Sequence, residues 1–129
     1  MNTFQWKDFV DVADELCNKN NEASIRCALS RYYYAAFGHS REYLTDTLKE
    51  HQYVSGEDIH SRVLNRFEDS SFDEENIISD PLDRLRKSRI NADYDKKLRK
   101  HNMSIIKKET KFVLDKVDKL NQNPVHPPF

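Results

Sequence analysis

Two stretches of the sequence combine residue types that can bind or act on a phosphate group. The first is the run SRYYYAAFGH at residues 30–39, and the second is the run LRKSRINADYD at residues 85–95. In the second run, Arg86 and Arg89 lie three positions apart. On a helix this spacing puts both guanidinium groups on one face, where together they can clamp a phosphate. The sequence therefore predicts a phosphate-binding pair at these two arginines.

A structural role competes with this hypothesis for each arginine of the two runs. The three candidates are Arg31, Arg86 and Arg89. Any one of them could instead pair with Asp93 and lock the helix of the first run against the helix of the second. The first run also holds three consecutive tyrosines at residues 32–34, which cannot all face one core. At least one tyrosine hydroxyl is therefore expected at a boundary or in a cleft.

Histidine is the side chain best suited to carry a proton at neutral pH, and the chain has five of them. His60 lies between the two runs and is the leading proton carrier, with a purely structural role as the alternative. His39 follows Arg31 by eight positions, a looser spacing for a shared site. The histidines lack metal-ligand spacing, and the common phosphate-loop, dinucleotide and zinc-protease motifs are missing. Neither a metal nor a cofactor is expected.

Charge is unevenly distributed along the chain although the net charge is only -1. Residues 84–119 carry thirteen Lys and Arg against five Asp and Glu, a balance of +8 that leaves -9 for the rest. On one helix over residues 95–120, five basic side chains would share the side opposite the apolar residues, namely Lys97, Lys100, His101, Lys108 and Lys111. This stripe predicts an RNA-binding surface, and a simple solvated helix face is the alternative.

The elements that must position these residues are helices. Only Gly38 and Gly56 supply glycine, whereas sheets and hairpins usually need more of it for their turns. Apolar residues recur at three- and four-residue steps in five segments. The expected helices span residues 3–18, 22–51, about 59–67, 81–94 and 95–120. The sequence therefore predicts an all-α fold, an antiparallel bundle of four to five helices, with Gly38 marking a close approach inside the long second helix.

One domain over residues 1–120 is expected to be followed by a short disordered tail at residues 121–129, which holds three of the four prolines. No apolar run approaches the roughly 20 residues that a membrane span requires. The N-terminus also lacks the pattern of a secretory signal. No membrane association is therefore expected, and the cytoplasm is the expected location, with Cys17 and Cys27 reduced.

The run SRYYYAAF, the histidine at position 60 and the run LRKSRINADYD, in that order, resemble minimal HEPN proteins. The resemblance covers roughly residues 25–95. It implies a bundle of four or five helices that forms a homodimer across a cleft. Some members of that family are metal-independent endoribonucleases of toxin–antitoxin or phage-defence modules. Others are partners or substrate-binding subunits of minimal nucleotidyltransferases.

Active HEPN members carry an arginine and a histidine separated by four to six residues, and this pattern is missing here. None of the nine arginines has a histidine five to seven positions later, and Arg89 is followed at five by Tyr94. A histidine could move the proton of a ribose hydroxyl while arginine stabilises the charged phosphate. Tyrosine is a poor base at neutral pH because its phenol stays protonated.

The sequence thus predicts a HEPN-like component of a toxin–antitoxin or phage-defence module that binds nucleotide or RNA at a homodimer cleft. Arg89, His60 and Tyr94 are the candidates for catalysis, and Arg31 and Arg86 are candidates for ligand binding. One alternative is an active metal-independent endoribonuclease toxin. The other is an interaction subunit of a minimal nucleotidyltransferase whose acidic middle segment meets a basic partner.

The homodimer has a second argument besides the resemblance. On the expected last helix, Met103 and Leu114 lie off the main apolar arc and are therefore expected to face a second copy. A nucleotidyltransferase or an antitoxin is expected as a further protein partner.

Overall fold

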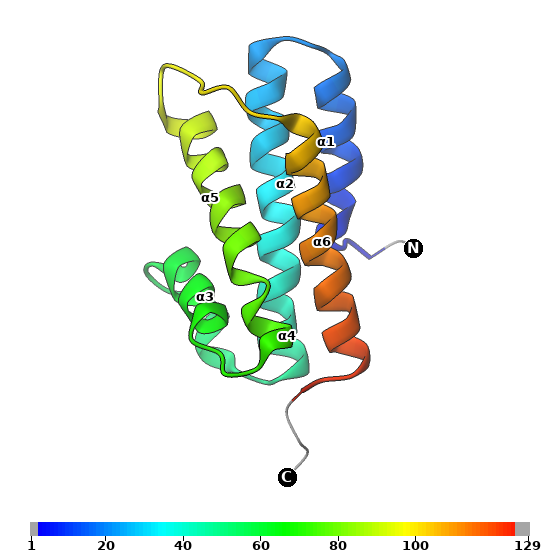
Figure 1. The fold of residues 1–129 in the computed structure, drawn as a ribbon, viewed down its shortest axis with the longest axis vertical. Coiled ribbons are helices and arrows are strands. Elements are labelled where there is room, and N and C mark those ends of the chain that lie inside the picture. The colour runs from blue at the N-terminus through cyan, green and yellow to red at the C-terminus, as the bar shows by residue number, and fades with distance from the viewer. Residues whose placement is uncertain (1–2, 126–129) are drawn as a thin grey trace.

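The computed structural model describes residues 3–125, and its regular secondary structure is helical, with no strand in that range. Its helices are α1 (Phe9–Asn18), α2 (Glu22–Glu42), α3 (Ile59–Glu68), the single turn α4 (Asp73–Asn76), α5 (Ser79–Tyr94) and α6 (Met103–Gln122). Figure 1 shows them as an antiparallel bundle. The predicted all-α fold is confirmed. Helix α6 ends two residues past the expected domain boundary, and residues 126–129 of the expected tail lie outside the described residues.

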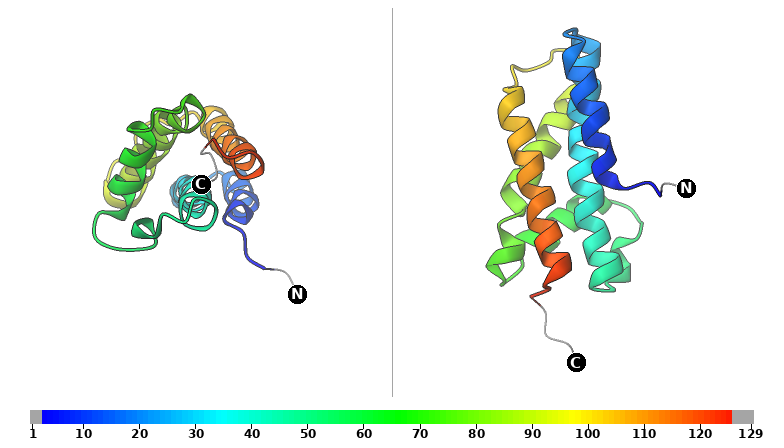
Figure 2. Two further views of the ribbon diagram at one scale, coloured as in Figure 1. Left: turned by 90° about the horizontal axis from the view of Figure 1, so that it is seen from below. Right: turned by 90° about the vertical axis from the view of Figure 1, so that its right-hand side faces the viewer.

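Helix α2 forms the centre of the bundle. It packs against α1, α5 and α6, which surround it in the end-on view of Figure 2. Its buried side chains face several directions at once, and they include Leu29, Tyr32, Tyr33, Ala36 and Phe37. Because it is covered on most sides, α2 fixes the positions of the helices that carry the second run.

The second helix is shorter than predicted. It was expected to reach His51, but α2 ends at Glu42 and continues as one wider turn over Tyr43–Thr47, in which the Leu48 N–H donates to the Tyr43 carbonyl. The wider turn lets both Tyr43 and Leu44 point into the core, where each is at most 1% exposed. Core packing therefore overrides the regular helical repeat here, although no proline or glycine marks the change.

The predicted start of the last helix at Asp95 is wrong. Residues 95–102 form a loop, and α6 begins at Met103, where the Asn102 side chain accepts a hydrogen bond from the Ile105 N–H. Asparagine in this position caps a helix as well as aspartate does. The cap that forms is therefore seven residues later than the expected one.

Long-range hydrogen bonds hold the 95–102 loop. The buried Asn91 amide donates to the Asp95 carboxylate and the Lys97 carbonyl and accepts from the Arg99 N–H. From α2, Arg26 donates to the carbonyls of residues 92, 95 and 96. A helix through this segment would take those carbonyls for its own backbone bonds, so the loop is the better-satisfied arrangement.

The N-terminal segment packs directly on α2. Residues Trp6–Asp8 form a short 3-10 turn ahead of α1, instead of the continuous helix expected from Thr3. The Trp6 indole lies on Gly38, where an added Cβ would be 2.0 Å from the indole Cδ2. The close approach expected at Gly38 is therefore made by the indole of this turn.

A fully buried carboxylate joins α2, α3 and α4. Glu75 is 0% exposed, and its oxygens accept hydrogen bonds from the Tyr43 hydroxyl, the Ser70 hydroxyl and the Arg66 guanidinium. Arg66 also forms a two-pronged ion pair with Glu50. Burial and the neighbouring carboxylate raise the pKa of Tyr43, so its phenol remains a donor. The acidic segment between α3 and α5 is thus anchored by one interior charge.

Within residues 3–125, no helix is both long and apolar enough to cross a bilayer.

Candidate functional site: an arginine and aromatic face around His60

Side chains from α2, α3 and α5 meet on one side of the bundle, where α5 packs against both α2 and α3. We call this surface the arginine–aromatic face. It consists of Arg31, Tyr33, Tyr34, Phe37, His60, Arg86, Arg89 and Tyr94. The two runs and His60, which are far apart in the sequence, therefore come together as the phosphate-site hypothesis requires.

His60 lies between the two runs. Its Nδ1 is 2.6 Å from the Tyr33 hydroxyl, and its ring stacks on Phe37 with 4.4 Å between the ring centroids. Burial lowers the pKa of His60, and the positive charges of Arg89, Arg86 and Arg41 lower it further. The imidazole is therefore neutral at pH 7.

The Tyr33 hydroxyl determines which nitrogen of His60 carries the proton. Burial raises the pKa of Tyr33, so its phenol keeps its hydrogen. Across residues 3–125 that hydroxyl has no other hydrogen-bond partner, so it donates to Nδ1 of His60. The neutral ring then carries its own hydrogen on Nε2, which has no partner among the same residues and is not buried. His60 thus presents a hydrogen-bond donor at the surface.

Arg86 is half-buried beside His60. Its Nη2 donates to the Ser61 hydroxyl at 3.1 Å, which fixes the guanidinium against α3. Over the described part of the chain, no carboxylate forms an ion pair with it. A guanidinium held by a neutral partner keeps its full attraction for an anion. Arg86 is therefore available to bind an anion.

Arg89 is the arginine that pairs with Asp93, with 2.8 Å between its Nε and the carboxylate. The pair joins two residues of α5 four positions apart, so it does not provide the lock between two helices that was expected of Asp93. The link to α2 is a hydrogen bond of 2.9 Å from Arg89 Nη2 to the Tyr34 hydroxyl. The guanidinium also lies over the rings of Tyr34 and Tyr94, at 5.2 and 5.4 Å.

Arg31 extends the face toward α1. Its guanidinium lies 4.9 Å from the centre of the Phe9 ring and 5.4 Å from that of Tyr34. Both Arg31 and Arg89 therefore contact the ring of Tyr34, which is half-buried, whereas Tyr32 and Tyr33 are buried. The expectation that one of the three tyrosines lies at a boundary is confirmed for Tyr34.

The predicted basic stripe on a single helix does not form. Lys97, Lys100 and His101 lie in the 95–102 loop, and only Lys108 and Lys111 are on α6. His101 is half-buried, with Nε2 3.0 Å from the Asn91 amide oxygen, and burial together with Arg99 lowers its pKa. The reason is the later start of α6, which removes the common helical axis that would have aligned the five side chains.

Three residues of the face were not among the sequence candidates, namely Tyr33, Tyr34 and Phe37. The tyrosine run gave a general signal for Tyr33, but its contact with His60 depends on how α2 is rotated against α3. His39, the looser candidate, is directed elsewhere, because its Nε2 lies 2.7 Å from the Asp118 carboxylate on α6.

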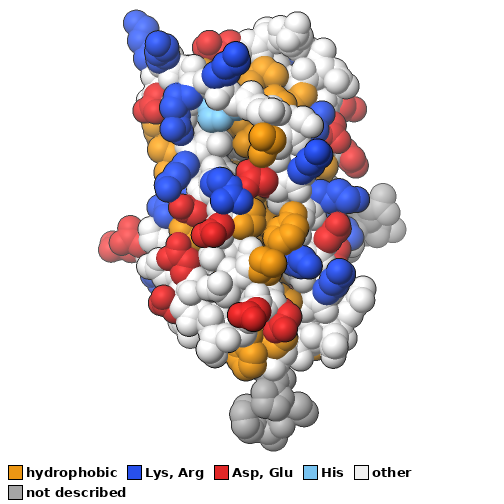
Figure 3. Space-filling model, in the orientation of Figure 1, with side chains coloured by type: hydrophobic (Ala, Val, Ile, Leu, Met, Phe, Trp, Pro, Cys, Tyr) orange, Lys and Arg blue, Asp and Glu red, His pale blue; other side chains and the backbone are white. Residues whose placement is uncertain are grey.

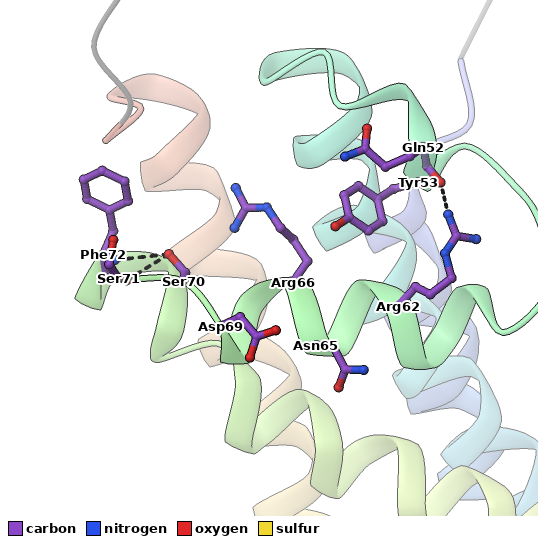
Figure 4. Close-up of a pocket in the computed structure, with 9 residues that line it drawn as sticks. All are labelled: Gln52, Tyr53, Arg62, Asn65, Arg66, Asp69, Ser70, Ser71 and Phe72. Atoms are coloured by element: carbon purple, nitrogen blue, oxygen red, sulfur yellow. Dashed lines mark hydrogen bonds between the residues drawn. The ribbon is translucent and has the colours of Figure 1, made fainter.

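A hollow of about 690 Å³ lies on another part of α3 (Figure 4). Its arginines are already engaged with other groups. Arg62 donates to the backbone carbonyls of Ser55 and Glu57, and Arg66 pairs with Glu50 and the buried Glu75. The charge of Arg66 is balanced by these carboxylates, so it attracts an anion less than Arg86 does, and the donors of Arg62 are committed to backbone carbonyls. We therefore place the candidate site at the arginine–aromatic face.

No protein-family model matches this sequence, and no significant match was found among curated proteins or solved structures. The functional argument therefore rests on the geometry of the face.

Replacing His60 with glutamine should make the protein less sensitive to acid. Because the pKa of His60 is lowered on folding, the unfolded chain takes up this proton first as the pH falls below about 6.5. The unfolded state then binds more protons, so His60 reduces stability on the acid side and has no such effect above that range. Urea unfolding between pH 7.5 and 5 should show that the free energy of unfolding falls less steeply with pH for His60→Gln than for the parent protein.

The exposed His51 provides the control, since His51→Gln should keep the pH dependence of the parent protein. An unchanged acid-side slope in His60→Gln would contradict a neutral, partly desolvated imidazole at this position.

Proposed function

We propose that the protein is a HEPN-like component of a toxin–antitoxin or phage-defence module that binds RNA or nucleotide through the phosphate. The observation that carries the proposal is the half-buried Arg86, which has no acidic partner in the described chain and lies beside the outward-facing N–H of His60. A phosphate oxygen accepts hydrogen bonds from both kinds of donor. The remaining arginines of the face strengthen its attraction for an anion.

The arrangement supports binding better than cleavage. A general base needs a free lone pair within reach of the ribose hydroxyl. In His60 the nitrogen at the surface carries the hydrogen, and the other nitrogen is occupied by Tyr33. Tyr94, which replaces the histidine of active family members, donates nothing to the ring of His60 and contacts Arg89 instead. The endoribonuclease alternative is therefore the weaker proposal.

Replacing Arg86 with glutamine should weaken binding of a labelled single-stranded RNA by about tenfold or more. The reason is that a charge-assisted hydrogen bond contributes roughly 1.5–3 kcal/mol. The slope of binding against salt should also decrease by about one, because one phosphate contact is lost. Fluorescence anisotropy across a salt series measures both quantities.

Arg84→Gln is the matched control, because Arg84 lies on the same helix, is mostly exposed and pairs with Glu109. A Lys108→Glu/Lys111→Glu double variant tests the rival surface on α6. If that variant loses RNA affinity while Arg86→Gln binds like the parent, the site belongs on α6 and the proposal fails.

We also propose that the protein is a homodimer, and that the second copy covers the seam between α5 and α6. Met103 and Leu114 no longer support this, because Met103 is half-buried against the core and Leu114 is 9% exposed. Instead, Ile77 and Ile105 are exposed beside the half-buried Phe112. Figure 3 shows an apolar strip there with charged side chains on both sides.

The charges beside the seam suit a two-fold pairing. A groove of about 430 Å³ carries one charge of each sign on each helix, Asp80 and Arg84 on α5 and Lys108 and Glu109 on α6. In a symmetric dimer each surface meets its own copy, so α5 of one chain can face α6 of the other with opposite charges in contact.

Replacing Ile77, an exposed residue of this groove, with glutamate should convert the dimer into a monomer, because a charge would be buried without a partner at the interface. Light scattering should give about twice the chain mass of 15.3 kDa for the parent and about that mass for the variant. Ile90→Glu, at an exposed isoleucine outside this groove, should remain dimeric. A monomeric parent at high micromolar concentration would contradict the dimer.

A further inference from the structure

The most exposed large side chain of the arginine–aromatic face is Tyr94, the last residue of α5. Its relative exposure is 71%. The Arg89 guanidinium lies over one face of its ring at 5.4 Å, which leaves the opposite face open to solvent. The phenol hydroxyl is 3.5 Å from Arg89 Nη2, at the outer limit of a hydrogen bond. The hydroxyl therefore does little to hold the ring, and the exposed ring surface is the feature that needs an explanation.

An aromatic ring backed by a guanidinium and open on its other face is suited to stacking with a flat, electron-rich group. Nucleobases stack on tyrosine rings and on arginine planes, and phosphate binds to arginine. At Tyr94 both requirements are met within one cluster, because Arg89 contacts its ring and Arg86 lies on the same helix. The base and the adjoining phosphate of one nucleotide can thus be held together.

Acidic neighbours do not prevent this. Asp93 is paired with Arg89, and the Asp95 carboxylate accepts a hydrogen bond from the Asn91 amide. The charge of Asp93 is therefore offset within the protein, the Asp95 carboxylate is oriented toward Asn91, and the positive charge of Arg86 is left for the ligand.

We infer that the face selects single-stranded RNA by stacking an unpaired base on the open side of Tyr94 while the adjoining phosphate binds the arginines. In a duplex both faces of each base are covered by its neighbours in the stack, so no base has a free face that can stack on the Tyr94 ring. The preference is tolerant of sequence, because every base offers a flat face. This inference rests on the proposed function and adds to it the class of substrate.

The test compares a labelled single-stranded RNA with the duplex of the same sequence, against the parent, Tyr94→Phe and Tyr94→Leu. The parent and Tyr94→Phe should bind the single strand more tightly than the duplex, because phenylalanine keeps the ring. Tyr94→Leu should bind the single strand about 5- to 100-fold more weakly and should leave duplex binding unchanged. A 2-aminopurine in the strand should be quenched by the parent and by Tyr94→Phe only.

Circular dichroism checks that each variant keeps the helical content of the parent, as expected for a change at an exposed helix end. Equal binding of single strand and duplex by the parent, or no loss for Tyr94→Leu, overturns the inference. The Arg86→Gln variant distinguishes a failure of this inference from a failure of the proposed function. If Arg86→Gln still lowers RNA affinity, phosphate binding stands without base stacking. If Arg86→Gln has no effect on any RNA, the proposed function fails too.

Discussion

Replacing Arg66 with methionine should lower the free energy of unfolding by about 3–5 kcal/mol, because it leaves a buried carboxylate without its charged partner. Glu75 is 0% exposed, and Arg66 supplies the positive charge beside it. The hydroxyls of Tyr43 and Ser70 would remain as donors, but neither carries a charge. Urea unfolding followed by circular dichroism measures the change at constant m-value.

Two further variants identify the cause. Arg66→Met combined with Glu75→Gln should recover much of the loss, because the amide is neutral, its oxygen can accept from one hydroxyl and its N–H can donate to the oxygen of the other. Arg84→Met should change stability by less than about 1 kcal/mol, since Arg84 is 58% exposed in its pair with Glu109. A loss below about 1 kcal/mol for Arg66→Met would mean that water reaches Glu75 in the folded protein.

Replacing Gly38 with alanine should destabilise the fold by about 1–3 kcal/mol, the cost of forcing an extra carbon into packed space. The new Cβ would lie 2.0 Å from the Trp6 indole, a rigid ring that must move as a whole. Trp6 is the only tryptophan, so its fluorescence reports the displacement directly. The emission maximum should shift to longer wavelength as the indole becomes more exposed.

Removing the indole should reverse the sign of this effect. In a Trp6→Ala background, Gly38→Ala should be neutral or stabilising by up to about 1 kcal/mol, because alanine is the better residue inside a helix. If Gly38→Ala alone stabilises the protein and leaves its fluorescence unchanged, the Trp6–Asp8 turn accommodates the added carbon without loss of stability.

The helical fold was predictable because its signals are local. Few glycines and regular apolar spacing predict α3, the C-terminal end of α1 and the first 21 residues of the second helix, which match the observed elements closely. The end of α6 at Gln122 likewise falls close to the predicted one.

The errors in the predicted elements come from contacts between residues far apart in the sequence. Asp95 is a reasonable helix cap by its residue type, yet Arg26, almost 70 positions earlier, binds the carbonyl groups of that segment. The end of α2 depends in the same way on the burial of Tyr43 beside Glu75. Neither partner is visible in a local window of sequence.

The candidate site, like the fold, could be predicted from the sequence only in part. The spacing of Arg86 and Arg89 on one helix was sufficient to predict that both contribute to one face. The Arg89–Asp93 pair also follows from spacing, since residues four apart on a helix are neighbours. The contact of His60 with Tyr33 could not be predicted, because it requires the rotation of two helices about their axes.

The different partners of Arg86 and Arg89 have a kinetic consequence. The charge of Arg89 is offset by Asp93, so at a distance this pair acts as a small dipole. The charge of Arg86 is offset by no carboxylate in the described chain, so its field extends into solvent. An approaching anion is therefore attracted more by Arg86 than by Arg89, and salt screens this attraction. Arg89 acts only at contact, where a phosphate must compete with Asp93, so its influence falls on how long a ligand stays.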